Sequence, residues 1–341
     1  MSLKWISLKP QKWVAFSGAQ LSHCADHKPA MHQSTSNVFM IRPQSFRKNE
    51  ETATNNLYQQ TLEGISPEEL IERAQKEFDA LSDALGAAGV NVFVFEEQEP
   101  YETPDALFPN NWISTHENGD IGLYPMFAPN RRTERREDII VQLEHDAGFD
   151  VQNIIDFTEF ESHDRFLEGT GSMVLDRVHR KAYAAISPRT DETALLHFCQ
   201  EFDYEPVAFS ALQTAEGKRL PIYHTNVMMS IGSGFCAICL SSIDDVEERE
   251  AVQQEIESNG LEIIALSESQ IAQFAGNMLE LQGANGPIIA MSSSAFHALD
   301  TEQTAALKKH GELVHADLTT IETCGGGSAR CMIAEIHLTK G

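Results

Sequence analysis

The strongest constraint on the fold of this 341-residue chain is an internal repeat of short apolar strands, each preceded by an amphipathic helical stretch. The starts of successive strands lie 61, 54, 56 and 52 residues apart. Unrelated segments would not keep so even a spacing, so the chain is predicted to repeat one structural unit. The expected strands cover residues 90–95, 151–157, 205–209, 261–266 and 313–318.

The helical stretches carry their own start signals. Ser66 stands at an N-cap position, Pro67 suits the first helical position, and Glu69 is placed to complete a capping box. Asp300 and Gln303 repeat this box near the end of the chain. The pattern predicts one helix opening at these first residues and others near 134–147, 191–202, 244–258 and 300–311.

Each internal unit continues into two apolar runs around a polar turn, which is typical of a β-hairpin. The expected hairpins cover 112–126, 172–187, 227–241 and 278–292. The final run, 331–338, has its natural partner near the start of the chain, at 37–43. No unit could bury its strands alone, so the sequence predicts one α/β domain over residues 36–341: a closed ring of five ββαβ modules with pseudo-fivefold symmetry. Residues 1–35 are expected to be an N-terminal extension.

Composition excludes several classes of protein. The charge of −26 argues against a nucleic-acid partner and against anionic membranes. No run of 18 apolar residues is present, and the first 33 residues lack the apolar core of a secretory signal. Six cysteines are too few for a disulfide scaffold in so long a chain, and they fit a reducing cytoplasm. Cys236 and Cys239 lie in a strand pattern that sends them to opposite faces, so core packing is expected rather than metal or redox chemistry.

Reactive residues recur once per unit, at the ends of the apolar strands. Cys331 follows the turn Gly325–Ser328 and is expected to open a strand, where its thiol is exposed and activated; a buried strand cysteine is the alternative. His224 suits a general acid and base, and Glu168 lies among glycines that allow a ligand to approach. Structural roles are the alternative for both. Asn110 and Asn111 offer donors and acceptors, although Pro-Asn-Asn is also an ordinary turn.

Together these motifs resemble the pentein superfamily of guanidine-modifying enzymes, in which five ββαβ modules surround a pseudo-fivefold axis. The chain shows LEG at 167–169, HTN at 224–226 and GGGSARC at 325–331, in the family's order. The resemblance covers roughly residues 36–338, and within the superfamily the motifs look like the amidinotransferase-like citrulline-utilisation hydrolases.

The resemblance implies a mechanism without a metal or organic cofactor. The Cys331 thiolate would add to the central carbon of a guanidino or ureido group, and Glu168 would hold the substrate nitrogens. His224 would protonate the leaving nitrogen and then activate water. In arginine-acting members two further carboxylates clamp the guanidinium, but this chain has Asn111 and Asn226 at those positions. Amides suit a neutral ureido group, so citrulline is the expected substrate, cleaved to ornithine, ammonia and carbon dioxide.

Four arginines are candidates for holding the substrate's α-carboxylate, with surface solvation as the alternative for most of them: Arg42, Arg131, Arg132 and Arg330. Two other functions remain possible for a chain of this fold. One is an arginine deiminase, dihydrolase or amidinotransferase, and the other is a non-catalytic binding protein of the same fold. The expected partner is a small amino acid, with neither nucleic acid nor membrane, and a homodimer is expected.

Overall fold

The computed structural model describes residues 32–98, 103–215 and 217–341. Within these residues the strands form five three-stranded sheets of one topology and a separate hairpin, β9 (Leu212–Ala215) with β10 (Lys218–Pro221). The sheets are β17 (Ala334–Glu335)–β1 (Asn37–Arg42)–β2 (Asn91–Glu96), β3 (Ile113–Thr115)–β4 (Asp120–Leu123)–β5 (Asn153–Asp156), β6 (Val174–Asp176)–β7 (Lys181–Ala185)–β8 (Glu205–Phe209), β11 (Met229–Ile231)–β12 (Phe235–Ile238)–β13 (Glu262–Ala265), and β14 (Leu279–Gly283)–β15 (Gly286–Ser292)–β16 (Glu312–Ala316).

Every sheet joins its first two strands antiparallel and adds the third in parallel after a helix. A parallel pair needs such a crossover, whereas an antiparallel pair needs only a tight turn. The crossover helices are α1 (Pro67–Ala87), α2 (Glu137–His145), α4 (Glu192–Phe202), α5 (Val246–Ser258) and α8 (Thr301–His310). The predicted hairpins, helices and parallel strands are therefore confirmed, within a few residues at their ends.

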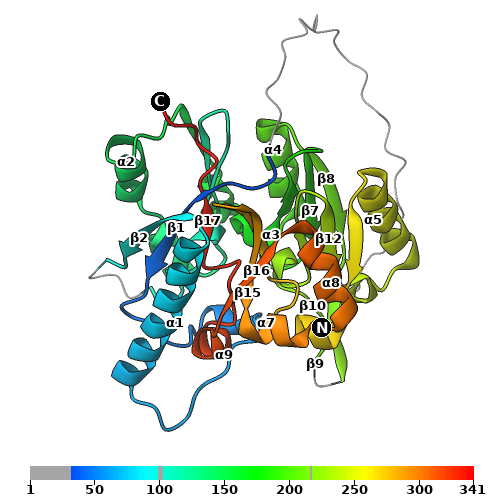
Figure 1. Ribbon diagram of the computed structural model, residues 1–341, viewed down its shortest axis with the longest axis horizontal. Coiled ribbons are helices and arrows are strands. Elements are labelled where there is room, and N and C mark those ends of the chain that lie inside the picture. Colours follow the sequence, from blue (N-terminus) through cyan, green and yellow to red (C-terminus); the bar gives the residue numbers. More distant parts are fainter. Residues whose placement is uncertain (1–31, 99–102, 216) are drawn as a thin grey trace, which may run out of the picture. The chain divides into compact units, whose positions relative to one another are not determined.

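The two ends of the described chain meet in one sheet. Val38 pairs with Glu335 and Phe39 with Ala334, so β17 lies antiparallel beside β1 (Figure 1). This confirms the predicted pairing of 331–338 with 37–43. The strand itself is shorter than expected: Cys331 lies in a turn three residues before β17, where its N–H donates to the Ser328 carbonyl at 2.9 Å. The prediction that Cys331 opens the strand is wrong, because the backbone first makes this extra turn.

Residues just before the expected start at 36 also contact distant strands. The side-chain amide of Gln33 donates to the carbonyl of Leu175 at 2.9 Å, and the Thr35 hydroxyl donates to that of Ile336 at 2.7 Å. These residues are part of the folded unit, because their polar groups are satisfied by strands far away in the sequence. Residues 1–31, which hold most of the expected extension and Cys24, lie outside the described residues.

Local sequence explains how the helices begin. Asp300 and Gln303 form both halves of the predicted capping box. At α1 only one half forms: Ser66 accepts from the Glu69 N–H, whereas the Glu69 carboxylate pairs with Arg73 at 2.7 Å. Four short helices were not predicted: α3 (Gly169–Ser172), α6 (Glu268–Ile271), α7 (Ser293–Ala298) and α9 (Thr319–Gly325). Short helices escape periodicity analysis because they contain too few turns to show an apolar stripe.

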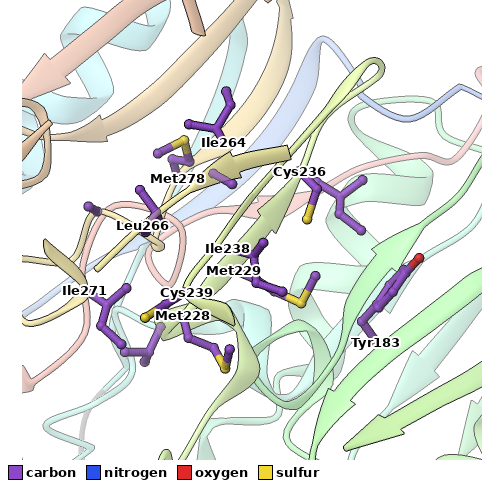
Figure 2. Packing of buried hydrophobic residues seen from close by; sticks show 14 of the residues in the cluster. Tyr183, Met228, Met229, Cys236, Ile238, Cys239, Ile264, Leu266, Ile271 and Met278 are labelled. Atoms are coloured by element: carbon purple, nitrogen blue, oxygen red, sulfur yellow. The ribbon is translucent and has the colours of Figure 1, made fainter. Parts of the chain in front are cut away.

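The core confirms the expected role of the C-x-x-C pair. Cys236 and Cys239 are fully buried free thiols, and Figure 2 shows them among Met228, Met229 and Ile238. In the described part of the chain, no group of His, Cys, Asp and Glu side chains is arranged to hold a metal ion. No helix there is both long and apolar enough to cross a membrane.

Candidate active site

Three buried side chains from three different loops form the centre of the candidate site. Glu168 immediately precedes α3, His224 precedes the 3-10 turn Thr225–Val227, and Cys331 lies between α9 and β17. Their exposed fractions are 0%, 2% and 3%. Local glycines make the approach of these loops possible, because a Cβ on Gly171 would lie 2.8 Å from the His224 ring.

Glu168 is the acceptor around which the site is arranged. Its Oε2 lies 2.7 Å from His224 Nε2, and its Oε1 accepts from the Phe127 N–H at 2.9 Å. Arg189 and Arg131 lie 3.5 and 3.9 Å from the same carboxylate. Burial alone would raise the pKa of Glu168, but Arg189, His224 and Arg131 outweigh it and hold the pKa well below its ordinary value. Glu168 is therefore ionised at neutral pH.

His224 is neutral in the resting site. Burial lowers its pKa to about 4, against the smaller raising effect of Glu168. An ionised carboxylate can only accept, so Nε2 of the neutral ring carries the proton that Glu168 binds, and Nδ1 is left as a base. Nδ1 also borders the space above Gly171, at 2.8 Å from where a Cβ would lie. The ring is thus placed and polarised for proton transfer on that side.

Two side-chain amides surround the sulfur of Cys331. Asn277 Nδ2 lies 3.2 Å from Sγ and Asn226 Nδ2 lies 3.6 Å from it. Among the described residues, Sγ makes no hydrogen bond with His224. Thiol and imidazole are therefore separate groups that can act on different atoms of one bound substrate.

The predicted pair Asn110 and Asn111 lies beside Glu168 and His224. Asn111 Oδ1 accepts from Arg131 at 2.8 Å, and Asn110 Nδ2 donates to the Thr170 hydroxyl at 3.3 Å. The other ends of both amides, Asn111 Nδ2 and Asn110 Oδ1, are buried without a hydrogen-bond partner among the described residues. A buried, unpaired donor and acceptor are costly unless a ligand or water satisfies them. The pair therefore has the means to bind a group that both donates and accepts.

The arginines proposed to hold a carboxylate already have carboxylate partners in the protein. Arg131 is fully buried and bound to Glu134 at 2.8 Å, Arg330 is bound to Glu335 at 2.7 Å, and Arg42 is bound to Asp79 at 2.8 Å on the α1 side of β1. Arg132 lies 3.5 Å from Glu161. Arg131 orients Asn111 and Glu168. Substrate binding by any of these four arginines stays a prediction.

Two residues of the site were not predicted. Asn277 lies in the segment GNMLEL, which begins just before a hairpin strand, at the same position in its repeat unit as the other site segments in theirs. This shared position was the sequence signal that could have indicated Asn277. Arg189 follows β7 in a turn without a repeated motif. Its guanidinium lies over the Tyr223 ring, 4.9 Å from the centroid, and reaches Glu168. The predicted hairpin 172–187 brings Glu168 and Arg189 to the same end, but no motif marks Arg189 as a partner of the carboxylate.

A segment between β1 and α1 covers the glycine turn that precedes Cys331. Asn56 donates to the Gly326 carbonyl at 3.1 Å and Gln59 donates to the Gly325 carbonyl at 2.9 Å. Asn55 and the Thr52 carbonyl accept from Arg189. Residues 49–60, called the covering segment below, thereby connect the nucleophile's turn to the arginine that neutralises Glu168.

Comparisons with known proteins agree with this arrangement. The family model described as N,N-dimethylarginine dimethylhydrolase, eukaryotic, matches residues 42–338. No curated protein sequence matches the chain. Among solved structures, the substrate-bound N-terminal domain of the cyanobacterial arginine dihydrolase ArgZ superposes with a TM-score of 0.66 at 16% identity, covering 88% of this chain and 97% of that domain. The chain spans 40% of the longer ArgZ chain.

Two other solved structures share the fold. AgrE, in a complex with ornithine and NAD⁺, matches with a TM-score of 0.67 at 17% identity, covering 89% of this chain and 39% of AgrE. A dimethylarginine dimethylaminohydrolase adduct with S-methyl-L-thiocitrulline matches with a TM-score of 0.56 at 13% identity, covering 88% and 99%. These likenesses show a pentein-like α/β fold. The chain therefore belongs to the family described as eukaryotic N,N-dimethylarginine dimethylhydrolase, within the guanidino-modifying pentein superfamily, and is a hydrolase of carbon–nitrogen bonds other than peptide bonds.

Proposed function

We propose that the chain hydrolyses the ureido group of citrulline to ornithine, ammonia and carbon dioxide, as in the citrulline-utilisation branch of the superfamily. One observation carries the proposal: two neighbouring side-chain amides beside Glu168 and His224 hold buried polar atoms without a partner among the described residues. Asn111 and Asn110 offer an unpaired donor and acceptor, and Asn226 lies beside the sulfur. A ureido group presents a carbonyl acceptor and N–H donors, which is the complementary set.

The charge of the site supports the same choice. Glu168 already contacts Arg189, Arg131 and His224, so its negative charge is matched within the protein. A guanidinium would have to share that carboxylate with two arginines, whereas it is bound best by carboxylates of its own. A neutral group meets no such competition. The site therefore favours the ureido over the guanidino group.

The proposed reaction uses the three central side chains in order. Nδ1 of His224 takes up the proton of the Cys331 thiol as the sulfur attacks the ureido carbon, and the tetrahedral adduct collapses as His224 delivers that proton to the leaving nitrogen. A thiocarbamate on Cys331 remains. Water, deprotonated by His224, attacks this carbon and displaces the thiolate. The resulting carbamate loses carbon dioxide and yields the second amine, while Glu168 orients the ring throughout.

Arginine dihydrolysis is the second candidate, because the solved structures that share this fold include ArgZ, an arginine dihydrolase. That reaction releases two ammonia molecules per ornithine, whereas citrulline hydrolysis releases one. Transfer of an amidino group to an acceptor amine would instead raise turnover when such an amine is added. Product stoichiometry, with and without an acceptor amine, separates the three reactions.

The decisive experiment measures ornithine and ammonia from purified wild type and Cys331→Ala, offered citrulline, arginine and dimethylarginine separately. We expect citrulline turnover that the substitution abolishes. Cys236→Ala, which removes a core thiol, is the matched control and retains activity. Turnover of arginine alone would overturn the citrulline proposal while leaving Cys331 as the nucleophile.

We further propose that the five sheets form a closed ring of ββαβ modules around one axis. Their common topology and the β17–β1 pairing support this arrangement. A crystal structure in which the five sheets share no axis would contradict it. A homodimer that acts on a small amino acid in the cytoplasm, without nucleic acid or membrane, also remains a proposal. Gel filtration with light scattering and cell fractionation test it.

A further inference from the structure

Asn277 is a fully buried amide whose polar atoms are all engaged around the sulfur of Cys331. Its Nδ2 donates to Sγ at 3.2 Å and to the Asn226 carbonyl at 3.0 Å. Its Oδ1 accepts from the Arg330 N–H at 3.0 Å. One side chain thus joins the sulfur of Cys331 to the backbone of Asn226 on one loop and to the backbone of Arg330 on another.

These contacts fix which end of the amide faces the sulfur. A backbone N–H can only donate, so the oxygen of Asn277 must face Arg330 and the nitrogen must face Sγ. Asn226 has no such constraint, since its nitrogen and oxygen lie 3.6 and 3.9 Å from Sγ. Gly276 brings the loop into place, because a Cβ there would lie 2.4 Å from the Val227 carbonyl.

The charged and titratable groups around Cys331 do not replace this donor. His224 is neutral, and Arg131 and Arg189 face Glu168. Arg330 is bound to Glu335. Tyr223, whose pKa burial raises, is neutral and donates its hydroxyl to the Gly326 carbonyl. A buried thiolate is costly unless donors stabilise it, and in the described residues the donors to Sγ are the amides.

We propose that Asn277 is a further catalytic residue: its amide N–H donates to the Cys331 sulfur, stabilises the thiolate and aims it at the substrate carbon. Its role in turnover rests on the proposed function, but its effect on the thiolate does not. The amide keeps its proton throughout the reaction. The hydrogen bond strengthens when the sulfur is ionised, as free thiolate and again as leaving group, and weakens while the sulfur is bonded to carbon.

The test compares wild type with Asn277→Asp and Asn277→Ala. The first substitution places an acceptor of nearly the same shape against the sulfur, and the second removes the donor without adding charge. We measure the rate of iodoacetamide alkylation of Cys331 against pH, by mass spectrometry of its peptide, together with citrulline turnover. In Asn277→Asp we expect alkylation at neutral pH to slow at least tenfold and its midpoint to rise by about one pH unit. In Asn277→Ala we expect a smaller shift in the same direction, and in both variants a fall in kcat with little change in KM.

The outcomes separate this proposal from the proposed function. An unchanged alkylation profile in a folded Asn277→Ala would overturn the role of Asn277, even if turnover fell. A shifted profile in a protein that does not hydrolyse citrulline would support Asn277 and overturn the substrate. Asn259→Asp adds the same charge beyond the end of α5 and should leave the profile unchanged. Thermal unfolding of each variant identifies any that fails to fold.

Discussion

At the scale of single residues, burial and charged neighbours together decide which groups of the site carry charge. Glu168 is fully buried, yet its arginine partners keep it ionised, whereas burial leaves His224 neutral. The two groups share one hydrogen bond of 2.7 Å, so a change in the protonation state of one changes the pKa of the other. Their protonation states determine stability as well as reactivity.

The depressed pKa of His224 makes folding stability depend on pH. The unfolded chain binds a proton on this ring below about pH 6.5, whereas the folded protein does so only near pH 4. Stability is therefore lost as pH falls from 6.5 to 4, by up to about 3 kcal/mol. We expect urea unfolding of His224→Gln to lose less stability across this window than wild type does. His163→Gln, at an exposed position, is the matched control and should follow wild type.

Removing the charge of Glu168 leaves Arg189 without its buried carboxylate. We expect Glu168→Gln to lower the free energy of unfolding by about 3 kcal/mol at pH 7. Turnover should fall at least a hundredfold, because the ring of His224 loses the acceptor that orients it. Urea titration and steady-state kinetics measure the two effects. A fully active Glu168→Gln would exclude this carboxylate from the mechanism.

Sequence could predict the site residues that stand beside distinctive local chemistry. Cys331 follows a glycine-rich turn, and His224 and Glu168 stand at the start of turns. These turns occur at similar positions in successive repeat units, and this regularity indicated the three residues. Arg189 was missed because it stands in no distinctive motif, although it faces Glu168, 21 residues away, at the open end of the β6–β7 hairpin. Asn277 was missed as an individual residue because its role depends on a backbone N–H of a distant loop. The contact of Asn277 arises only from tertiary folding.

At the scale of elements, the covering segment 49–60 lies against the glycine turn that precedes the nucleophile. It was not predicted, since it contains only a one-turn 3-10 helix, Thr52–Thr54. Its hydrogen bonds go to main-chain carbonyls of the glycine turn, at Gly325 and Gly326. Because Cys331 is only 3% exposed, we expect a substrate to displace part of this cover to reach the sulfur.

Loosening the covering segment should therefore expose the thiol. Each of the bonds from Asn56 and Gln59 contributes about 1 kcal/mol, which is roughly a fivefold change in an opening equilibrium. We expect Asn56→Ala combined with Gln59→Ala to speed iodoacetamide alkylation of Cys331 about tenfold or more. Asn118→Ala, in the turn between β3 and β4, should leave the rate as in wild type. An unchanged rate in the double variant would show that access lies elsewhere.

At the scale of the whole described unit, neighbouring sheets share hydrophobic cores. Phe39 of β1 is fully buried and packs against Phe95 of β2 and Trp112 before β3, so it joins two sheets. The repeat and hairpin signals predicted the strands and most of their pairing. The packing between sheets could not be read from them, because periodicity assigns a residue to a face and not to its partner.

This packing predicts one cooperative unfolding transition. Phe39→Ala and Phe235→Ala each remove a buried ring from a different sheet, at a cost of about 3–5 kcal/mol. In calorimetry we expect either substitution to move the entire transition to lower temperature, with near-ultraviolet circular dichroism and activity lost together. Two resolved transitions, only one of them shifted, would show that the sheets are independent.

The pairing of β17 with β1 has a consequence for synthesis of the protein. Among the described strands β1 is made first and can pair with β2, but its other edge waits for β17, the strand that follows all the others in the sequence. The nucleophile, Cys331, emerges with β17. A nascent or prematurely terminated chain consequently has an unpaired strand edge and no reactive thiol at the site, so completion of the sheet and acquisition of activity coincide in time.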